Sequence, residues 1–181
     1  VAVSLLDLEI GTRDVWIFDV ARRLGERFTY ESGDDFGPNW SRPGGDRIFF
    51  SSLRQGSIDL YEKPSSGSGS ETLLLKDNLG KFNASASPDG RFLVYVGGGG
   101  VIGRSDIWVL PLSGERKPAA FLETRFRESQ GQFSPDGRWL ATAGMDQVIR
   151  LWSTADWTEA RQLTGHTATI CEVDWSPDSK R

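Results

Sequence analysis

The stretch Ser87-Pro88-Asp89-Gly90-Arg91 decides the fold, because it returns along the chain at nearly constant spacing. It recurs as Ser134-Pro135-Asp136-Gly137-Arg138 and as Ser176-Pro177-Asp178-Ser179-Lys180, and a degraded copy stands at Ser41-Arg42-Pro43-Gly44-Gly45-Asp46. From first to last, the offsets between copies are 46, 47 and 42 residues. Proline presets φ at the second turn position, and Asp-Gly supplies the conformations that a hairpin turn requires. A period of about 40–45 residues is typical of propellers with four strands per repeat.

The period at residues 83–124 shows how one repeat is built. A short strand enters the Ser-Pro-Asp-Gly turn, and residues 91–96 follow as a second strand rich in β-formers. A glycine-rich loop leads to a third strand at 106–111, and a further turn leads to a fourth at 119–122. No helical periodicity competes over a long window. The sequence therefore predicts an all-β fold, a β-propeller of four-stranded antiparallel blades.

The two ends of the chain each carry part of one repeat. Residues 169–175 read as a first strand followed by its turn, whereas residues 1–4 read as a second strand without a first. Joined end to end they make one ordinary repeat, so we expect one blade to be split between the termini of a single propeller domain, 1–181. The expected blades are 166–181 plus 1–30, 31–77, 78–124 and 125–165.

Composition and charge argue against several classes of partner. The net charge of −4 lacks the basic stripe that nucleic-acid binding needs, so we expect no nucleic acid. No apolar run approaches the roughly 20 residues that span a bilayer, so we expect no membrane partner. No signal-peptide pattern is visible, and Val1 leads directly into a strand. Cys171 is the only cysteine, which leaves no intrachain disulfide or thiolate metal site and fits a small core residue.

Three aspartates recur at the heads of the third strands, and converging carboxylates could bind a cation such as calcium. They are Asp14, Asp59 and Asp106. The alternative is that each caps a turn through backbone N–H groups, and we favour it because the recurrence follows from repetition. We therefore predict no catalytic residue, no cofactor and no metal, and keep these aspartates as the weak metal candidates.

The other chemistry-bearing residues favour structural roles. His166 is the only histidine, and its neighbours supply neither a nucleophile nor an orienting carboxylate, so we expect a hydrogen-bonded loop histidine. The run Gly97–Gly100 lacks the lysine and the helix of a phosphate loop. The segment 125–129 reads as an exposed connection. Turn roles are expected for Asp89, Asp136 and Asp178, and packing between blades for Trp16, Trp108, Trp139, Trp152 and Trp175.

These motifs resemble two known families of propeller repeat. Residues 35–143 resemble TolB-like repeats, through the two Ser-Pro-Asp-Gly-Arg turns and Ser105-Asp106-Ile107-Trp108. Residues 145–181 resemble WD repeats, through residues 148–153 and Leu163-Thr164-Gly165-His166, although Ser153 replaces the signature aspartate. The mixture indicates an engineered or recombined chimera, a de novo protein; a natural fragment is the other option. TolB-like relatives imply the periplasm and WD repeats the cytoplasm, so the localisation stays open.

The resemblance implies six to eight blades, whereas this chain supplies four. Sheets pack about 10 Å apart, so four close on a ring of radius roughly 6 Å and eight on roughly 13 Å. Four ordinary blades would leave wide outer gaps. We therefore predict a homodimer that forms one eight-bladed ring through exchanged terminal strands, with a closed four-bladed monomer as the alternative. The expected function is that of a non-enzymatic scaffold; the alternative is a natural fragment that binds a protein, a peptide or a ligand on its loop faces or in its channel.

Overall fold

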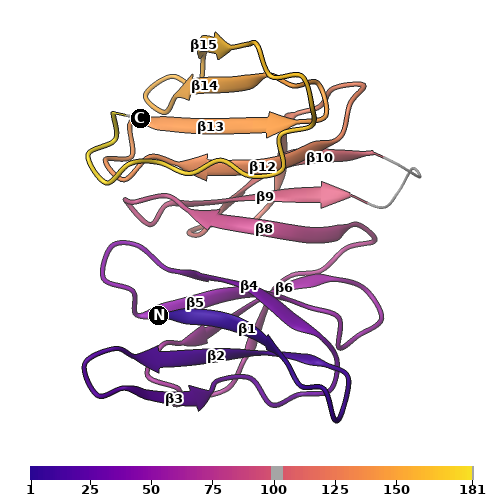
Figure 1. Ribbon diagram of the computed structural model, residues 1–181, viewed down its shortest axis with the longest axis vertical. Helices are drawn as coiled ribbons and strands as arrows, with labels where there is room; N and C mark the ends of the chain where they lie inside the picture. Colours follow the sequence, from indigo (N-terminus) through magenta and orange to yellow (C-terminus); the bar gives the residue numbers. More distant parts are fainter. Residues whose placement is uncertain (99–103, 181) are drawn as a thin grey trace. The chain divides into compact units, whose positions relative to one another are not determined.

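The computed structural model describes residues 1–98 and 104–180, and it assigns only strands and turns to them. The strands form four antiparallel sheets, one of three strands and three of four (Figure 1). The predicted β-propeller of antiparallel blades is confirmed. Within the described residues, no helix is long and apolar enough to cross a membrane.

Strand order within each sheet follows the chain, as hairpin connections require. The first sheet contains β1 (Ala2–Leu6), β2 (Arg13–Asp19) and β3 (Leu24–Arg27). The second contains β4 (Asp35–Trp40), β5 (Arg47–Ser52), β6 (Asp59–Pro64) and β7 (Thr72–Leu75). The third contains β8 (Gly80–Ala86), β9 (Phe92–Gly98), β10 (Ser105–Pro111) and β11 (Ala119–Leu122). The fourth contains β12 (Glu128–Phe133), β13 (Trp139–Gly144), β14 (Ile149–Ser153) and β15 (Glu159–Leu163).

The chain divides into two compact units, Val1–Ala84 and Ser85–Arg181, and the boundary falls within β8. In the first unit, side chains from the first two sheets form one core of Val15, Phe28, Ile48, Phe50 and Tyr61. In the second unit, β9 and β13 are buried on both faces over most of their length, whereas buried and half-buried residues alternate along part of β10. The fully buried side chains include Leu93, Ile107, Leu110 and Leu140.

Hydrogen bonds explain why serine and aspartate return in every repeat. The hydroxyls of Ser87, Ser134 and Ser176 each donate to the aspartate two residues on, at 2.7 Å. In the degraded copy, Ser41 makes the same 2.7 Å bond to Asp46, five residues on. Three of these hydroxyls also accept from the amide that opens the second strand, at 2.9–3.0 Å. The turn thus satisfies its own polar groups in each repeat.

The two chain ends differ from the remaining repeats. The first sheet has three strands, and β1 forms its edge. Residues 169–175 are not assigned as a strand, although they lie beside β12 (Figure 1): the amide of Ile170 donates to the Gly144 carbonyl at 3.2 Å, and the Trp175 indole N–H donates to the Gln132 carbonyl at 3.1 Å. The predicted split blade therefore stays a prediction.

The expectation that Cys171 is a core residue is wrong, because its side chain is exposed. Its neighbour Ile170 is the buried residue of this segment. Successive side chains of an extended segment point to opposite sides, so covering Ile170 turns Cys171 outward.

Candidate functional site

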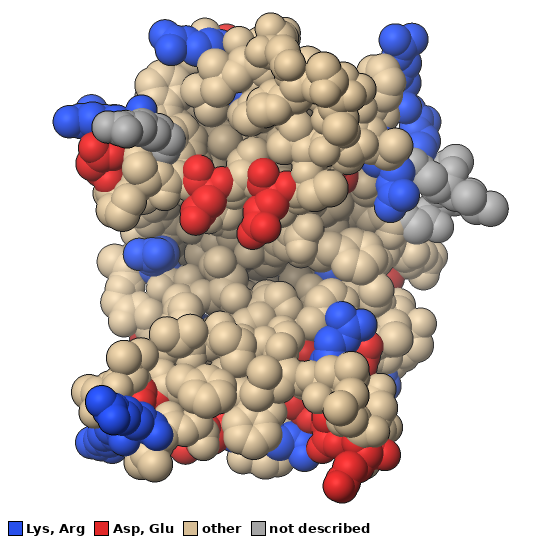
Figure 2. Space-filling view, in the orientation of Figure 1, with Lys and Arg blue, Asp and Glu red and all other residues tan. Residues whose placement is uncertain are grey.

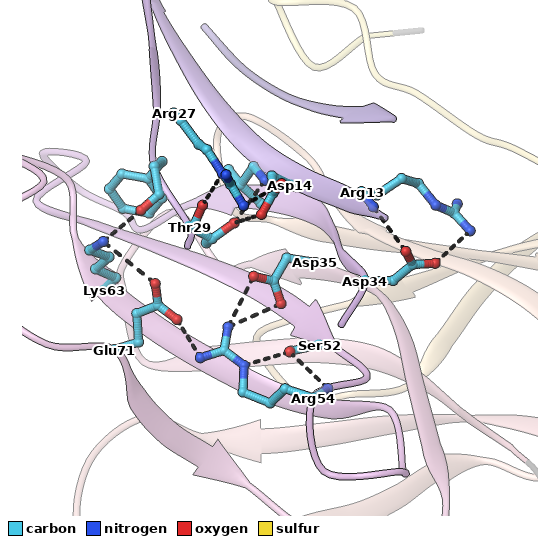
Figure 3. Close-up of polar contacts among 12 residues, drawn as sticks. Arg13, Asp14, Arg27, Thr29, Asp34, Asp35, Ser52, Arg54, Lys63 and Glu71 are labelled. Carbon is cyan, nitrogen blue, oxygen red and sulfur yellow. Dashed lines mark hydrogen bonds and ion pairs between the residues drawn. The ribbon is translucent and has the colours of Figure 1, made fainter. Parts of the chain in front are cut away.

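The first candidate aspartate, Asp14 at the start of β2, is already neutralised. Its side chain is buried, and the Arg27 guanidinium lies 2.8 Å from its carboxylate. The Thr29 hydroxyl donates to the same carboxylate at 3.4 Å, and Arg27 also donates to the Thr29 carbonyl (Figure 3). A carboxylate held by a guanidinium in this way has little left to offer a metal ion.

A second buried ion-pair network lies next to it in the same unit (Figure 3). Nη2 of Arg54 lies 3.0 Å from both carboxylate oxygens of Asp35, its Nε donates to Ser52 at 2.7 Å, and its Nη1 pairs with Glu71. The guanidinium also lies over the Tyr61 ring, 4.4 Å from its centroid. Burial raises the pKa of Asp35 above its ordinary value, although the bonds from Ser52 and Arg54 act in the opposite direction.

The second candidate aspartate, Asp59 at the start of β6, forms a completely buried ion pair. Nζ of Lys81 lies 3.2 Å from its carboxylate, and both side chains have no exposed surface. Ser57 donates to the other carboxylate oxygen at 2.9 Å, while Lys81 also contacts Asp77 at 2.8 Å and donates to the Leu79 carbonyl at 2.6 Å. Asp59 is therefore a structural anion.

The third candidate, Asp106 at the start of β10, has a different environment. Burial and the nearby Glu123 raise its pKa, and the Thr124 amide donates a hydrogen bond to it. Glu128, which begins β12, is only 1% exposed. Its Oε1 accepts from the Thr124 hydroxyl at 2.7 Å, but its Oε2 has no hydrogen-bond partner in the described part of the chain.

Burial also raises the pKa of Glu128, and the negative charges of Asp146 and Asp106 act in the same direction. Arg150 opposes this effect, but it is held elsewhere: its guanidinium lies 2.6 Å from Asp146 and 3.6 Å from Glu159. Its Nη1 is buried without a hydrogen-bond partner among the described residues. This corner therefore holds more carboxylates than cations.

The spacing of the repeat relates three of these residues, and the sequence analysis missed the relation. Asp35, Lys81 and Glu128 each stand six residues before a turn serine: Ser41, Ser87 and Ser134. They begin, or lie within one residue of beginning, the first strand of their repeats. The repeat offsets contained this signal, which only the buried contacts made visible.

Among the described residues, no group of three or more His, Cys, Asp or Glu side chains could hold a metal ion. Of the other candidates, His166 is exposed after β15, and the five named tryptophans are half-buried. Gly97 and Gly98 end β9, whereas Gly99 and Gly100 lie outside the described residues. Figure 2 shows charged side chains of both signs in small separate groups on the visible face, most of which is formed by other residues.

An aromatic groove lies within the second unit, between β9–β11 and the turn after β14. An apolar hollow of about 230 Å³ is lined by Phe92, Val109, Pro111, Ala119, Phe121 and Trp157. The Trp157 ring packs edge-on against Phe92 and Phe121, with centroids 5.4 and 5.5 Å apart. Trp157 adopts a left-handed φ of 59°, a conformation that is uncommon for a bulky residue, and the ring contacts offset its cost.

Comparisons with known proteins agree with this architecture. Residues 129–153 and 157–181 match the family model of the WD domain, G-beta repeat. The first match begins inside the stretch that resembles TolB-like repeats. A search of curated protein sequences found no match.

Solved structures resemble most of this chain. The structure of a putative TolB from Agrobacterium tumefaciens superposes with a TM-score of 0.75 at 19% identity, over 98% of this chain and 66% of that one. A chain of a nidogen/laminin complex gives 0.66 at 11%, over 86% and 57%. A chain of a mitotic checkpoint complex gives 0.64 at 18%, over 91% and 48%. This chain therefore spans less than two thirds of the length of each relative.

The sheets, the self-satisfied turns and these likenesses define the class of fold: the chain is a β-propeller. More particularly, it combines a TolB-like fold with WD40 repeats in its C-terminal part, as the sequence motifs predicted.

Proposed function

We propose that the chain is a non-enzymatic scaffold whose role is assembly, and that residues 169–175 of one copy complete the first sheet of a second copy. The first sheet contains the second, third and fourth strands of a repeat, and β1 stands at its edge. The C-terminal segment corresponds to a first strand without its successors. Two copies joined reciprocally form an eight-bladed ring with two exchanged closures.

The surface of the first sheet supports this proposal. Its strands and connections expose several large apolar side chains: Leu6, Leu8, Ile10, Val20 and Leu24. An unpaired edge beside exposed apolar residues is a site where another strand pairs. The buried ion pairs of Asp14 and Asp59 support a structural rather than a catalytic role for these carboxylates.

The mixture of repeat types supports an origin by recombination or design. The WD40 matches begin at residue 129, while the likeness to the TolB structure covers 98% of the chain. A natural propeller fragment that binds a protein or ligand is the second candidate, and the groove beside Trp157 is the observation that favours it. The closed four-bladed monomer remains the alternative to the dimer.

The experiment is a measurement of mass in solution at micromolar concentration. The chain mass is 20.0 kDa, so light scattering should give twice that value for the dimer. Val173→Pro removes an N–H group from the exchanged segment and should return the mass to that of one chain. Thr167→Pro, outside the segment, is the matched control and should stay dimeric. A wild-type mass near 20.0 kDa contradicts the exchanged ring.

A further inference from the structure

Equivalent positions in three successive repeats are occupied by Asp35, Lys81 and Glu128. Each residue comes after the aspartate at the head of the third strand in the preceding repeat. At the first two of these positions, the buried charge is neutralised by an oppositely charged side chain of the same protein. Arg54 lies 3.0 Å from Asp35, and Lys81 itself lies 3.2 Å from Asp59. The buried charges balance there, as low-dielectric surroundings require.

At the third of these positions the residue is acidic, and so is the residue at the head of the preceding third strand. Glu128 occupies the position of Lys81, and the aspartate before it is Asp106. Thr124 bonds to both, through its hydroxyl to Oε1 of Glu128 at 2.7 Å and through its amide to Asp106. Oε2 of Glu128 is buried, and no hydrogen-bond partner for it exists in the described residues. The place that Lys81 fills with an ammonium group has no such group here.

The local sequence explains why no arginine takes the place of the missing ammonium group beside Glu128. Asp35 pairs with Ser52 in register, and Glu128 pairs in the same way with Gly144. Two residues after Ser52 the chain places Arg54, but two residues after Gly144 it places Asp146. The sign of the charge at this turn is therefore inverted. The nearby Arg150 is bound to Asp146, and Oε2 of Glu128 has no hydrogen-bond partner among the described residues.

We propose that Asp106 and Glu128, with the negative charge of Asp146 nearby, form a binding site for the primary ammonium group of a ligand. Lys81 shows the arrangement that the fold supports, because its ammonium group bonds two carboxylates and a backbone carbonyl in the equivalent place. Asp106 is half-buried, so an ammonium group can approach past its carboxylate toward Glu128, whereas the Asp146 side chain is 6% exposed and already paired with Arg150. The three N–H donors of a primary ammonium group can each bond to a carboxylate oxygen. None of these carboxylates belongs to the exchanged segment 169–175 or to the first sheet.

The test titrates ¹⁵N-labelled protein with butylammonium chloride at pH 7.5 and constant ionic strength. Amide resonances of Thr124, Glu128 and Asp146 should shift together and saturate. Tetramethylammonium, which has no N–H donor, should leave them unchanged. Two further ligands distinguish a free amine from a protein side chain as the source of the ammonium group: an N-terminally acetylated lysine amide and a lysine-containing peptide. Saturable shifts with calcium or agmatine but not with butylammonium would overturn the assignment to an ammonium group.

Variants locate the site. Glu128→Gln should weaken butylammonium binding about tenfold or more, because a hydrogen bond to a charged group is lost. Asp106→Asn, at a half-buried position, should weaken it in the same direction even if the Glu128 variant folds poorly. Glu128→Lys supplies the ammonium group internally, as Lys81 does, and should abolish binding. Glu115→Gln, the same charge change at an exposed loop, should leave binding unchanged. Unaltered binding in the Glu128→Lys variant would overturn the proposal.

Discussion

The substitution Arg54→Met tests whether the buried ion-pair network holds the first unit together. It removes the guanidinium that lies between Asp35 and Glu71, whose side chains are 0% and 10% exposed. Breaking a buried pair by removing one partner costs about 3–5 kcal/mol, because an uncompensated charge stays in the interior. That is a large part of the roughly 5–15 kcal/mol that stabilises a typical domain. Urea denaturation followed by circular dichroism at pH 7.5 measures the loss.

Two further measurements separate lost charge balance from lost packing. Removing Arg54 takes away an influence that lowers the pKa of Asp35, so the folded form should then bind a proton more readily. The loss of stability should therefore be smaller at pH 5 than at pH 7.5. The double variant that adds Asp35→Asn removes the carboxylate that Arg54 neutralised, while Glu71 keeps its contact with Lys63 at 3.5 Å, and it should recover most of the loss. A single-variant loss below about 1 kcal/mol, the value of an exposed pair, would refute the reasoning.

Three other substitutions probe the turns, the buried acid and the aromatic groove. Ser134→Ala removes the hydroxyl between Asp136 and the Trp139 amide and should cost about 1–3 kcal/mol in urea denaturation, while an unchanged midpoint would contradict the turn account. Because the pKa of Glu128 is raised in the folded state, its contribution to stability should fall as pH rises above about 4.3, the ordinary value for glutamate. The difference in stability between wild type and Glu128→Gln should therefore shift in favour of the variant between pH 4 and pH 8, and a constant difference would count against this. Trp157→Gly relieves the left-handed φ but loses the ring contacts, and a net loss of about 2 kcal/mol is expected by thermal unfolding, whereas a gain would show that strain dominates.

The spacing of the turns carried most of the information about the fold. Serine, proline and aspartate at fixed offsets act locally, so their hydrogen bonds follow from a few neighbouring residues. The strands next to them follow from their β-forming composition. Long-range consequences of the same pattern were harder to predict. Cys171 was expected to be buried, but the side to which it points depends on which neighbouring strand covers Ile170.

The candidate site shows the same division between local and distant information. The sequence identified Asp14, Asp59 and Asp106 as equivalent, which their place at or next to the start of the third strands bears out. It could not tell that two of them are matched by cations, because Arg27 and Lys81 stand 13 and 22 residues further along the chain. Left-handed Trp157 was also missed, since no local pattern predicts a tryptophan in a conformation that favours glycine.

Because the same backbone returns in each repeat, one buried position can carry a different charge from one repeat to the next. The turn hydrogen bonds and the strand register fix where the sixth residue before each turn serine lies, whatever its side chain is. Asp35, Lys81 and Glu128 then stand at one structural place with charges of both signs, and each demands a different neighbour. Arg54 and Asp59 meet that demand in the first unit. Oε2 of Glu128 has no hydrogen-bond partner among the described residues, so this is the place where a bound cation would add stability to the fold.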